Sequence, residues 1–176
     1  ATNTPKDIPI CNVKTNKKLV SLSFDADFGN EDIEKILSVL KKYDVKTTFF
    51  ITGNWVEKYP EDVKKIQAAG HDLGNHSYHH KHMPELDAAG ISDEINTVTE
   101  KVKDLTGVTM NLFRPPYGDY SNALLTQAKS LNYYAIQWNI DSQDWKNYGT
   151  DSIVSTILNH KDLKNGSIIL MHNGAK

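Results

Sequence analysis

The chain of 176 residues has 20 Lys and Arg against 22 Asp and Glu, a formal net charge of -2 at pH 7. This balance excludes a general polyanion binder, and there is no basic run of the kind that contacts nucleic acid or anionic membranes. The length suits one domain with a continuous core. No apolar stretch approaches the roughly 18 residues that span a bilayer. The single Cys11 allows no internal disulfide.

Strand and helix patterns alternate along the chain. Alternating or β-branched runs predict six strands, at about 19–23, 45–52, 71–75, 110–113, 133–139 and 167–171. Apolar residues at helical spacing predict helices between most of them, for example at about 31–43 and from about 91 to Gly107. Strands joined through helices require a parallel sheet, either a (β/α) barrel or an open doubly wound sheet. No Gly-x-Gly-x-x-Gly follows the first strand, so a dinucleotide-binding fold has no support.

Residues capable of chemistry follow five of these predicted strands. They are Asp25 and Asp27, the segments 76–80, 114–118 and 141–145, and His172. Because the carboxyl ends of parallel strands meet at one edge of the sheet, we expect these side chains to form one site. For Asp25 and Asp27 alone, the alternative is a pair of turn and capping residues.

Two histidines in the second of these segments have the spacing of metal ligands. His76 and His80 are four residues apart, so both imidazoles can reach one metal, with a carboxylate as third ligand. Such a set suits zinc, cobalt or nickel. The alternative is a His-rich surface loop, because His79 and His82 lie beside them.

Two further pairs suggest acid–base chemistry. Arg114 precedes two prolines, and a rigidly placed guanidinium is suited to hold Asp25 ionised, although an ordinary surface arginine is the alternative. Asp141 is suited to orient His172 and raise its pKa, the pairing that makes a general acid. A lone histidine at a strand end is more often structural.

Aromatic residues occur near the same edge of the predicted sheet. Tyr117, Trp138 and Trp145 are, taken singly, typical core residues. Beside a polar site they are also suited to form stacking walls for sugar rings.

Five segments together resemble the polysaccharide deacetylases, the NodB-homology group also called carbohydrate esterase family four. Phe24–Asp25 is similar to the opening Thr-Phe-Asp-Asp motif, His76–His80 to His-Ser/Thr-x-x-His, Arg114–Tyr117 to Arg-x-Pro-Tyr, Asp141–Trp145 to Asp-x-x-Asp-Trp, and Leu170–His172 to Leu-x-His. The motifs follow the family's order and run from about residue 18 to residue 172. The resemblance implies a distorted (β/α) barrel that removes acetyl groups from sugars with the help of a metal.

The resemblance also assigns catalytic roles. Asp25 is expected to be the general base that activates water, and His172 the general acid that protonates the leaving amine or alcohol. Arg114 and Asp141 are expected to orient these two groups. The main-chain N–H of Tyr117 is expected to help hold the oxyanion.

The metal site departs from the family pattern at one position. His76 and His80 are expected to bind a divalent metal, most simply zinc, but Ala26 stands where the family has its metal-binding Asp, and Asp27 where it usually has Gly. Either Asp27 replaces the missing ligand, or waters complete the shell, with Asp25 drawn into it. We therefore expect a weakened metal site.

We expect residues 18–176 to be a deacetylase catalytic domain, preceded by an N-terminal segment, residues 1–17. The expected substrate is an acetylated polysaccharide such as chitin, peptidoglycan or acetylxylan, cleaved at an amide or ester bond. The alternative is a catalytically silent carbohydrate-binding homologue, because of Ala26. The family implies an extracellular or cell-wall location. Its usual last helix and strand have no counterpart before Lys176, which predicts an open edge beside the last strand.

Overall fold

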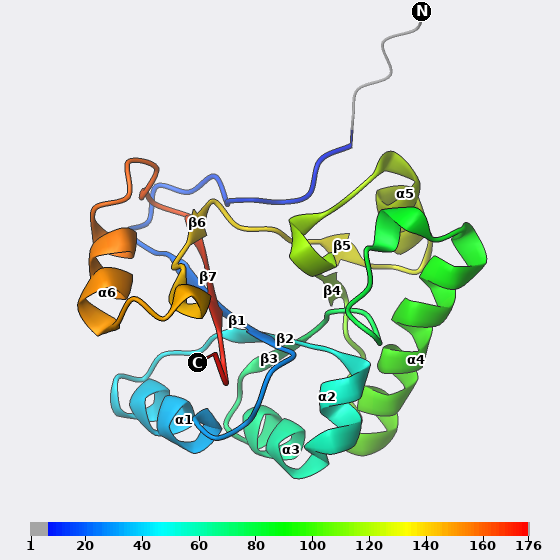
Figure 1. Ribbon diagram of the computed structural model, residues 1–176, viewed down its shortest axis with the longest axis horizontal. Coiled ribbons are helices and arrows are strands. Elements are labelled where there is room, and N and C mark those ends of the chain that lie inside the picture. Colours follow the sequence, from blue (N-terminus) through cyan, green and yellow to red (C-terminus); the bar gives the residue numbers. More distant parts are fainter. Residues whose placement is uncertain (1–6, 176) are drawn as a thin grey trace, which may run out of the picture.

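The computed structural model describes residues 7–175, which contain one sheet of seven strands (Figure 1). The strands are β1 (Ser21–Ala26), β2 (Thr48–Ile51), β3 (Asp72–Asn75), β4 (Leu112–Phe113), β5 (Tyr134–Ala135), β6 (Ile140–Asp141) and β7 (Ile168–His172). Their order in the sheet is β5-β4-β3-β2-β1-β7-β6, and every neighbouring pair is parallel. The predicted parallel sheet is confirmed.

The sheet curls into a distorted barrel because of how its two end strands are connected. β5 and β6 lie at opposite ends of the strand order, yet only residues 136–139 separate them in the chain. Five residue steps span at most about 18 Å, so the two ends must approach each other. The N-terminal segment helps to close the gap, since Ile10 bridges to Ile136 and Asn12 to Ser167. The barrel expectation is therefore confirmed, whereas the single predicted strand at 133–139 is wrong.

Helices surround the sheet (Figure 1). They are α1 (Ile33–Lys42), α2 (Gly53–Lys58), α3 (Pro60–Ala68), α4 (Ala88–Thr106), α5 (Asn122–Ser130) and α6 (Thr150–Leu158). α4 ends at Gly107 in the left-handed conformation with φ 77°, as the sequence predicts. The short α2 was not predicted, and it begins where the Thr52 side chain accepts a hydrogen bond from the Trp55 N–H. Within residues 7–175, no helix has the length and apolar character needed to cross a membrane.

The side chains of β1 point alternately into the core and into the barrel interior. Successive side chains of a strand point to opposite faces. Phe24 and Ala26 belong to the buried apolar cluster that the helices share with the sheet. Ser23 and Asp25 therefore point into the barrel. β1 carries Asp25 within the strand rather than after it, because the strand extends to Ala26.

The last strand is not an edge. β7 pairs with β1 on one side and with β6 on the other. The predicted open edge beside it is therefore wrong for the sheet in residues 7–175, whose edge strands are β5 and β6.

Candidate active site

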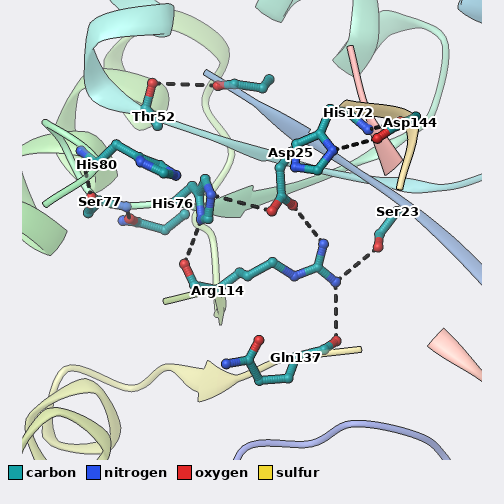
Figure 2. Close-up of polar contacts among 12 residues, drawn as sticks. Ser23, Asp25, Thr52, His76, Ser77, His80, Arg114, Gln137, Asp144 and His172 are labelled. Atoms are coloured by element: carbon teal, nitrogen blue, oxygen red, sulfur yellow. Dashed lines mark hydrogen bonds and ion pairs between the residues drawn. The ribbon is translucent and has the colours of Figure 1, made fainter. Parts of the chain in front are cut away.

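A cavity of about 410 Å³ gathers residues from five separate segments of the chain. Its lining comprises Asp25, Asp27, Phe28, His76, His80, Tyr117, Trp138, Asp141, Trp145, Leu170 and His172. The structure thus brings together every predicted site residue except Arg114, which lies behind Asp25 and contacts it directly (Figure 2). The parallel sheet places these segments together because each follows or ends a strand on the same rim.

Asp25 is held by a buried arginine. Its side chain is 6% exposed and that of Arg114 is 0% exposed, and Arg114 Nη1 donates to Asp25 Oδ1 at 2.7 Å. Arg114 Nη2 donates to Ser23 Oγ at 2.9 Å and to the Gln137 carbonyl oxygen at 3.2 Å. Burial disfavours the carboxylate, but the Arg114 charge outweighs it and holds the pKa of Asp25 below its ordinary value. Asp25 is therefore an ionised base in a water-poor setting. Ser23 was missed because a serine within a strand pattern carries no catalytic signal.

The tautomer of His76 follows from its backbone partner. His76 Nδ1 lies 2.7 Å from the carbonyl oxygen of Arg114, and since a carbonyl only accepts, Nδ1 carries the proton. Nε2 then presents a lone pair 3.4 Å from Asp25 Oδ2 (Figure 2). Burial lowers the pKa of His76 to about 4, so the ring is neutral at pH 7. Two acceptors thus face each other, an arrangement that a cation between or beside them would stabilise.

His80 completes the predicted imidazole pair. The ring centroids of His76 and His80 are 4.9 Å apart. Asp27 lines the same cavity, whereas Ala26 is packed in the core and offers no ligand atom. Within residues 7–175, no three His, Cys, Asp or Glu side chains are arranged as a ready metal-binding group. The residues therefore fit a divalent cation in part, with two imidazoles beside the ionised Asp25 and no third ligand in place.

The hydrogen-bond partner of His172 is Asp144, so the prediction that Asp141 orients this ring is wrong, although the charge of Asp141 does help to raise the pKa of His172. Asp144 Oδ1 accepts from His172 Nδ1 at 2.8 Å, and Asp144 Oδ2 accepts from the main-chain N–H of His172 at 2.6 Å. Burial opposes protonation of His172, but the hydrogen bond to Asp144 and the nearby charge of Asp25 outweigh it and raise its pKa above the ordinary value. His172 is thus suited to donate a proton from Nε2.

Local turn geometry explains why the second acid of the motif reaches His172. Asp141 Oδ1 accepts the main-chain N–H of Gln143 at 2.8 Å, which tightens the turn after β6. Gln143 is left-handed, with φ 57°, and a short 3₁₀ helix, Asp144–Lys146, follows. The turn carries Asp144 to the end of β7. Asp141 stays in the cavity lining and contributes only a longer-range charge to His172.

Aromatic side chains form the rim. Tyr117, in the left-handed region at φ 60°, is 59% exposed and stacks on His82 at a centroid distance of 4.1 Å. Trp145 is 48% exposed, while Trp138 lies deeper, with the Arg114 guanidinium 5.5 Å from its ring centre. Phe28 meets His172 edge-on at 5.9 Å and was missed by sequence reasoning. Its only signal was its position directly after Asp27.

A parallel barrel with a base, an acid and two imidazoles at the carboxyl ends of its strands defines a hydrolase-like site. The family described as polysaccharide deacetylase matches residues 12–136, and the chain belongs to this family. The peptidoglycan-N-acetylmuramic acid deacetylase PdaA of Bacillus subtilis (strain 168) is 36% identical over 166 residues, which cover 90% of this chain and 61% of that protein. The chain spans 51% to 62% of the length of such curated relatives.

Similar solved structures include a deacetylase and a protein described as a pseudoenzyme. A peptidoglycan N-acetylglucosamine deacetylase, Bc1960, superposes with a TM-score of 0.88 at 34% identity, covering 93% of this chain and 76% of that one. A wild-type pseudoenzyme of the CE4 family from Bacillus anthracis superposes with a TM-score of 0.90 at 33% identity, covering 94% of this chain and 58% of that one. A mutant of that pseudoenzyme is described as having restored enzymatic activity.

Proposed function

We propose that this domain removes acetyl groups from an acetylated cell-wall or related glycan, with a divalent cation, most simply zinc, as cofactor. The observation that carries the proposal is the paired acid and base. Asp25 and His172 are register partners on the adjacent strands β1 and β7, and each has its own orienting partner, the buried Arg114 for Asp25 and the partly buried Asp144 for His172. A module that only binds sugar needs neither group.

The protonation states of the two groups suit hydrolysis. Ionised Asp25 accepts the proton of the attacking water, and protonated His172 then donates its proton to the leaving nitrogen or oxygen. The bond between the acetyl carbon and the sugar heteroatom breaks, which gives acetate and the free amine or alcohol. The main-chain N–H of Tyr117 is proposed to stabilise the oxyanion, because such contacts act where charge develops in the transition state.

The cation is proposed to bind at His76 and His80, with Asp27 or water in the third position. A bound divalent cation would supply a Lewis acid for the acetyl carbonyl and favour deprotonation of water. The facing lone pairs of His76 Nε2 and Asp25 Oδ2, 3.4 Å apart, support a positive charge at this point. The weak donor set predicts an affinity below that of a site with three protein ligands.

Peptidoglycan and chitooligosaccharides are the proposed substrate classes. The named relatives support them, among them PdaA and a chitooligosaccharide deacetylase of Bradyrhizobium sp.. The exposed rings of Tyr117 and Trp145 also support a sugar polymer, which stacks its apolar faces on aromatic side chains. Such substrates imply action outside the cell or in the cell wall, and acetylxylan remains a further candidate to test.

A catalytically silent, glycan-binding domain is the second candidate. Ala26 favours it, because alanine cannot bind a metal and stands at the position of the family's metal-binding Asp. The similarity to a pseudoenzyme of the same fold supports it as well.

Acetate release separates the two candidates. Chelated protein and protein refilled with zinc or cobalt are incubated with chitin oligomers, peptidoglycan and acetylxylan. A deacetylase releases acetate from one substrate only when metal is restored, and Asp25→Asn abolishes release. Asp62→Asn, which neutralises a 7% exposed aspartate on α3 outside the cavity, is the control and retains activity. Binding of the oligomers without any acetate release would establish the silent candidate.

A further inference from the structure

The loop that carries the imidazole pair has an unusual backbone. It follows β3, and two of its non-glycine residues, Ser77 and His80, adopt left-handed conformations with φ 62° and 54°. Such conformations persist in non-glycine residues only where the surroundings hold them. The Ser77 N–H donates to Asn75 Oδ1 at 2.9 Å, and the His80 N–H donates to Ser77 Oγ at 3.1 Å. These local contacts fix the two ends of the turn.

The middle of the turn is held from another element. Glu94, on α4, is 3% exposed, and its Oε2 accepts the main-chain N–H groups of both Tyr78 and His79, at 2.9 and 2.8 Å. These two residues lie between Ser77 and His80. The Asn54 N–H of α2 also donates to the Tyr78 carbonyl oxygen, at 3.1 Å. One carboxylate oxygen of Glu94 therefore holds both N–H groups of this middle stretch, while α2 holds one of its carbonyl groups.

The second oxygen of Glu94 is neutralised at the surface. Oε1 lies 2.8 Å from Lys81 Nζ and 2.7 Å from His79 Nδ1. When both oxygens of a buried carboxylate accept hydrogen bonds, these bonds compensate for the hydration that the carboxylate has lost. Glu94 is thus a fully engaged anion whose contacts lie on one loop.

We propose that Glu94 is a positioning residue of the active site, which sets the relative placement of the His76 and His80 imidazoles by holding the two main-chain N–H groups between them. Glu94 lines no part of the cavity and touches neither ring, so it acts through the backbone. The inference rests on the proposed function for what the imidazole pair binds. Its geometric part holds without any cation.

Three variants isolate this contact. Glu94→Ala removes the acceptor of the two N–H groups. Glu94→Gln keeps an uncharged oxygen that accepts both. Lys81→Ala is the matched control, because it removes a partner of Oε1 and leaves Oε2 in place.

The first readout uses metal-free protein. Imidazole NMR resonances of His76 and His80 and hydrogen exchange of the Ser77 and His80 amides are measured, since neither amide bonds to Glu94. In Glu94→Ala, we expect both ring signals to shift and the two amides to exchange at least about tenfold faster, as the loss of two charge-assisted hydrogen bonds implies. Amides of β1 serve as the internal reference. Lys81→Ala is expected to stay close to the wild type, and Glu94→Gln is expected to lie between the wild type and Glu94→Ala, because the amide oxygen still accepts the two N–H groups but without the charge.

The second readout is a zinc titration by calorimetry. We expect the zinc affinity to fall at least about tenfold in Glu94→Ala and to recover in part in Glu94→Gln. If Glu94→Ala does not fold, Glu94→Asp, whose arm is one methylene shorter, replaces it with the same expected loss. Unchanged ring signals, loop exchange and zinc affinity in a folded Glu94→Ala protein would overturn the proposal. A wild type that binds no zinc would contradict the proposed cation, while the metal-free readout still decides the role of Glu94.

Discussion

Nε2 of His76 lies 3.4 Å from Oδ2 of Asp25, and both side chains are withdrawn from solvent, with 2% and 6% of their surfaces exposed. Each atom presents a lone pair at neutral pH, because His76 donates its only ring proton to the Arg114 carbonyl. The repulsion between the two atoms is tolerated because Arg114 supplies the opposite charge to Asp25. The site is thus poised for a positively charged or proton-donating ligand.

Acid should act on His76 well below the pH at which exposed histidines titrate. An unfolded histidine has a pKa of about 6.5, whereas burial lowers the pKa of folded His76 to about 4. The unfolded chain therefore binds the proton more readily, and stability is lost as the pH falls from about 6.5 toward 4. We expect NMR titration to show His76 neutral at pH 5.5. A titration of His76 near 6.5 would contradict the burial argument.

Replacement of Arg114 should destabilise the fold more than replacement of a surface cation. Arg114→Met leaves Asp25 as an unpaired buried charge, which costs about 3 to 5 kcal/mol in the free energy of unfolding. Lys64→Met is the control, because Lys64 pairs with Glu61 at the surface, with 47% and 74% of their side chains exposed. Exposed pairs contribute about 1 kcal/mol or less. Urea denaturation measures the free energy of unfolding of both variants. Equal decreases in the two variants would argue against a stabilising role of the buried Arg114–Asp25 ion pair.

Asp144 should control the charge of His172. The raised pKa of His172 means that the charged pair stabilises the folded protein below about pH 6.5 and that this stability is lost as the pH rises through the folded pKa. Asp144→Asn removes the main contact that raises the pKa of His172. The lowering effect of burial then dominates, so this pKa should fall. Asp141→Asn is the matched control and should shift it less, because Asp141 bonds to the Gln143 N–H instead. NMR titration of His172 decides between the two acids.

Restoring an acid at position 26 should couple folding to zinc. Ala26 is fully buried in the core, so Ala26→Asp buries a carboxylate and should lower the melting temperature of metal-free protein. Because position 26 faces the core, its carboxylate joins His76 and His80 around a cation only if the end of β1 turns toward the cavity. In that case zinc should raise the melting temperature more than it does in the wild type, because a ligand that binds only the folded state stabilises it.

Asp27→Ala tests the alternative third ligand in the same assay. A zinc affinity that Asp27→Ala reduces and Ala26→Asp leaves unchanged would establish Asp27 as the ligand. A zinc affinity that Asp27→Ala leaves unchanged would mean that Asp27 is not a ligand and would favour water in the third position.

Local signals in the sequence accounted for much of the architecture. Alternation and helical spacing are properties of neighbouring residues, so they predicted the parallel α/β order and the end of α4 at Gly107. The prediction of one strand at 133–139 was wrong because the local pattern of this segment is continuous. In the structure β5 and β6 are two strands, and they lie at opposite edges of the sheet. Pairing is a property of the closed barrel and leaves no mark in that segment.

The sequence by itself determined the rim on which the chemistry gathers, and it paired Arg114 with Asp25 across 89 positions of the chain. Only the tertiary structure decided that Asp144 rather than Asp141 accepts the hydrogen bond of the His172 ring, and that the Ala26 side chain faces the core. It also decided that Glu94 accepts the main-chain N–H groups between the two imidazoles. Motif spacing names the residue types that meet at a strand end. Which of two nearby carboxylates reaches a given nitrogen depends on backbone turns and on helix placement, and these are set by packing between segments far apart in the chain.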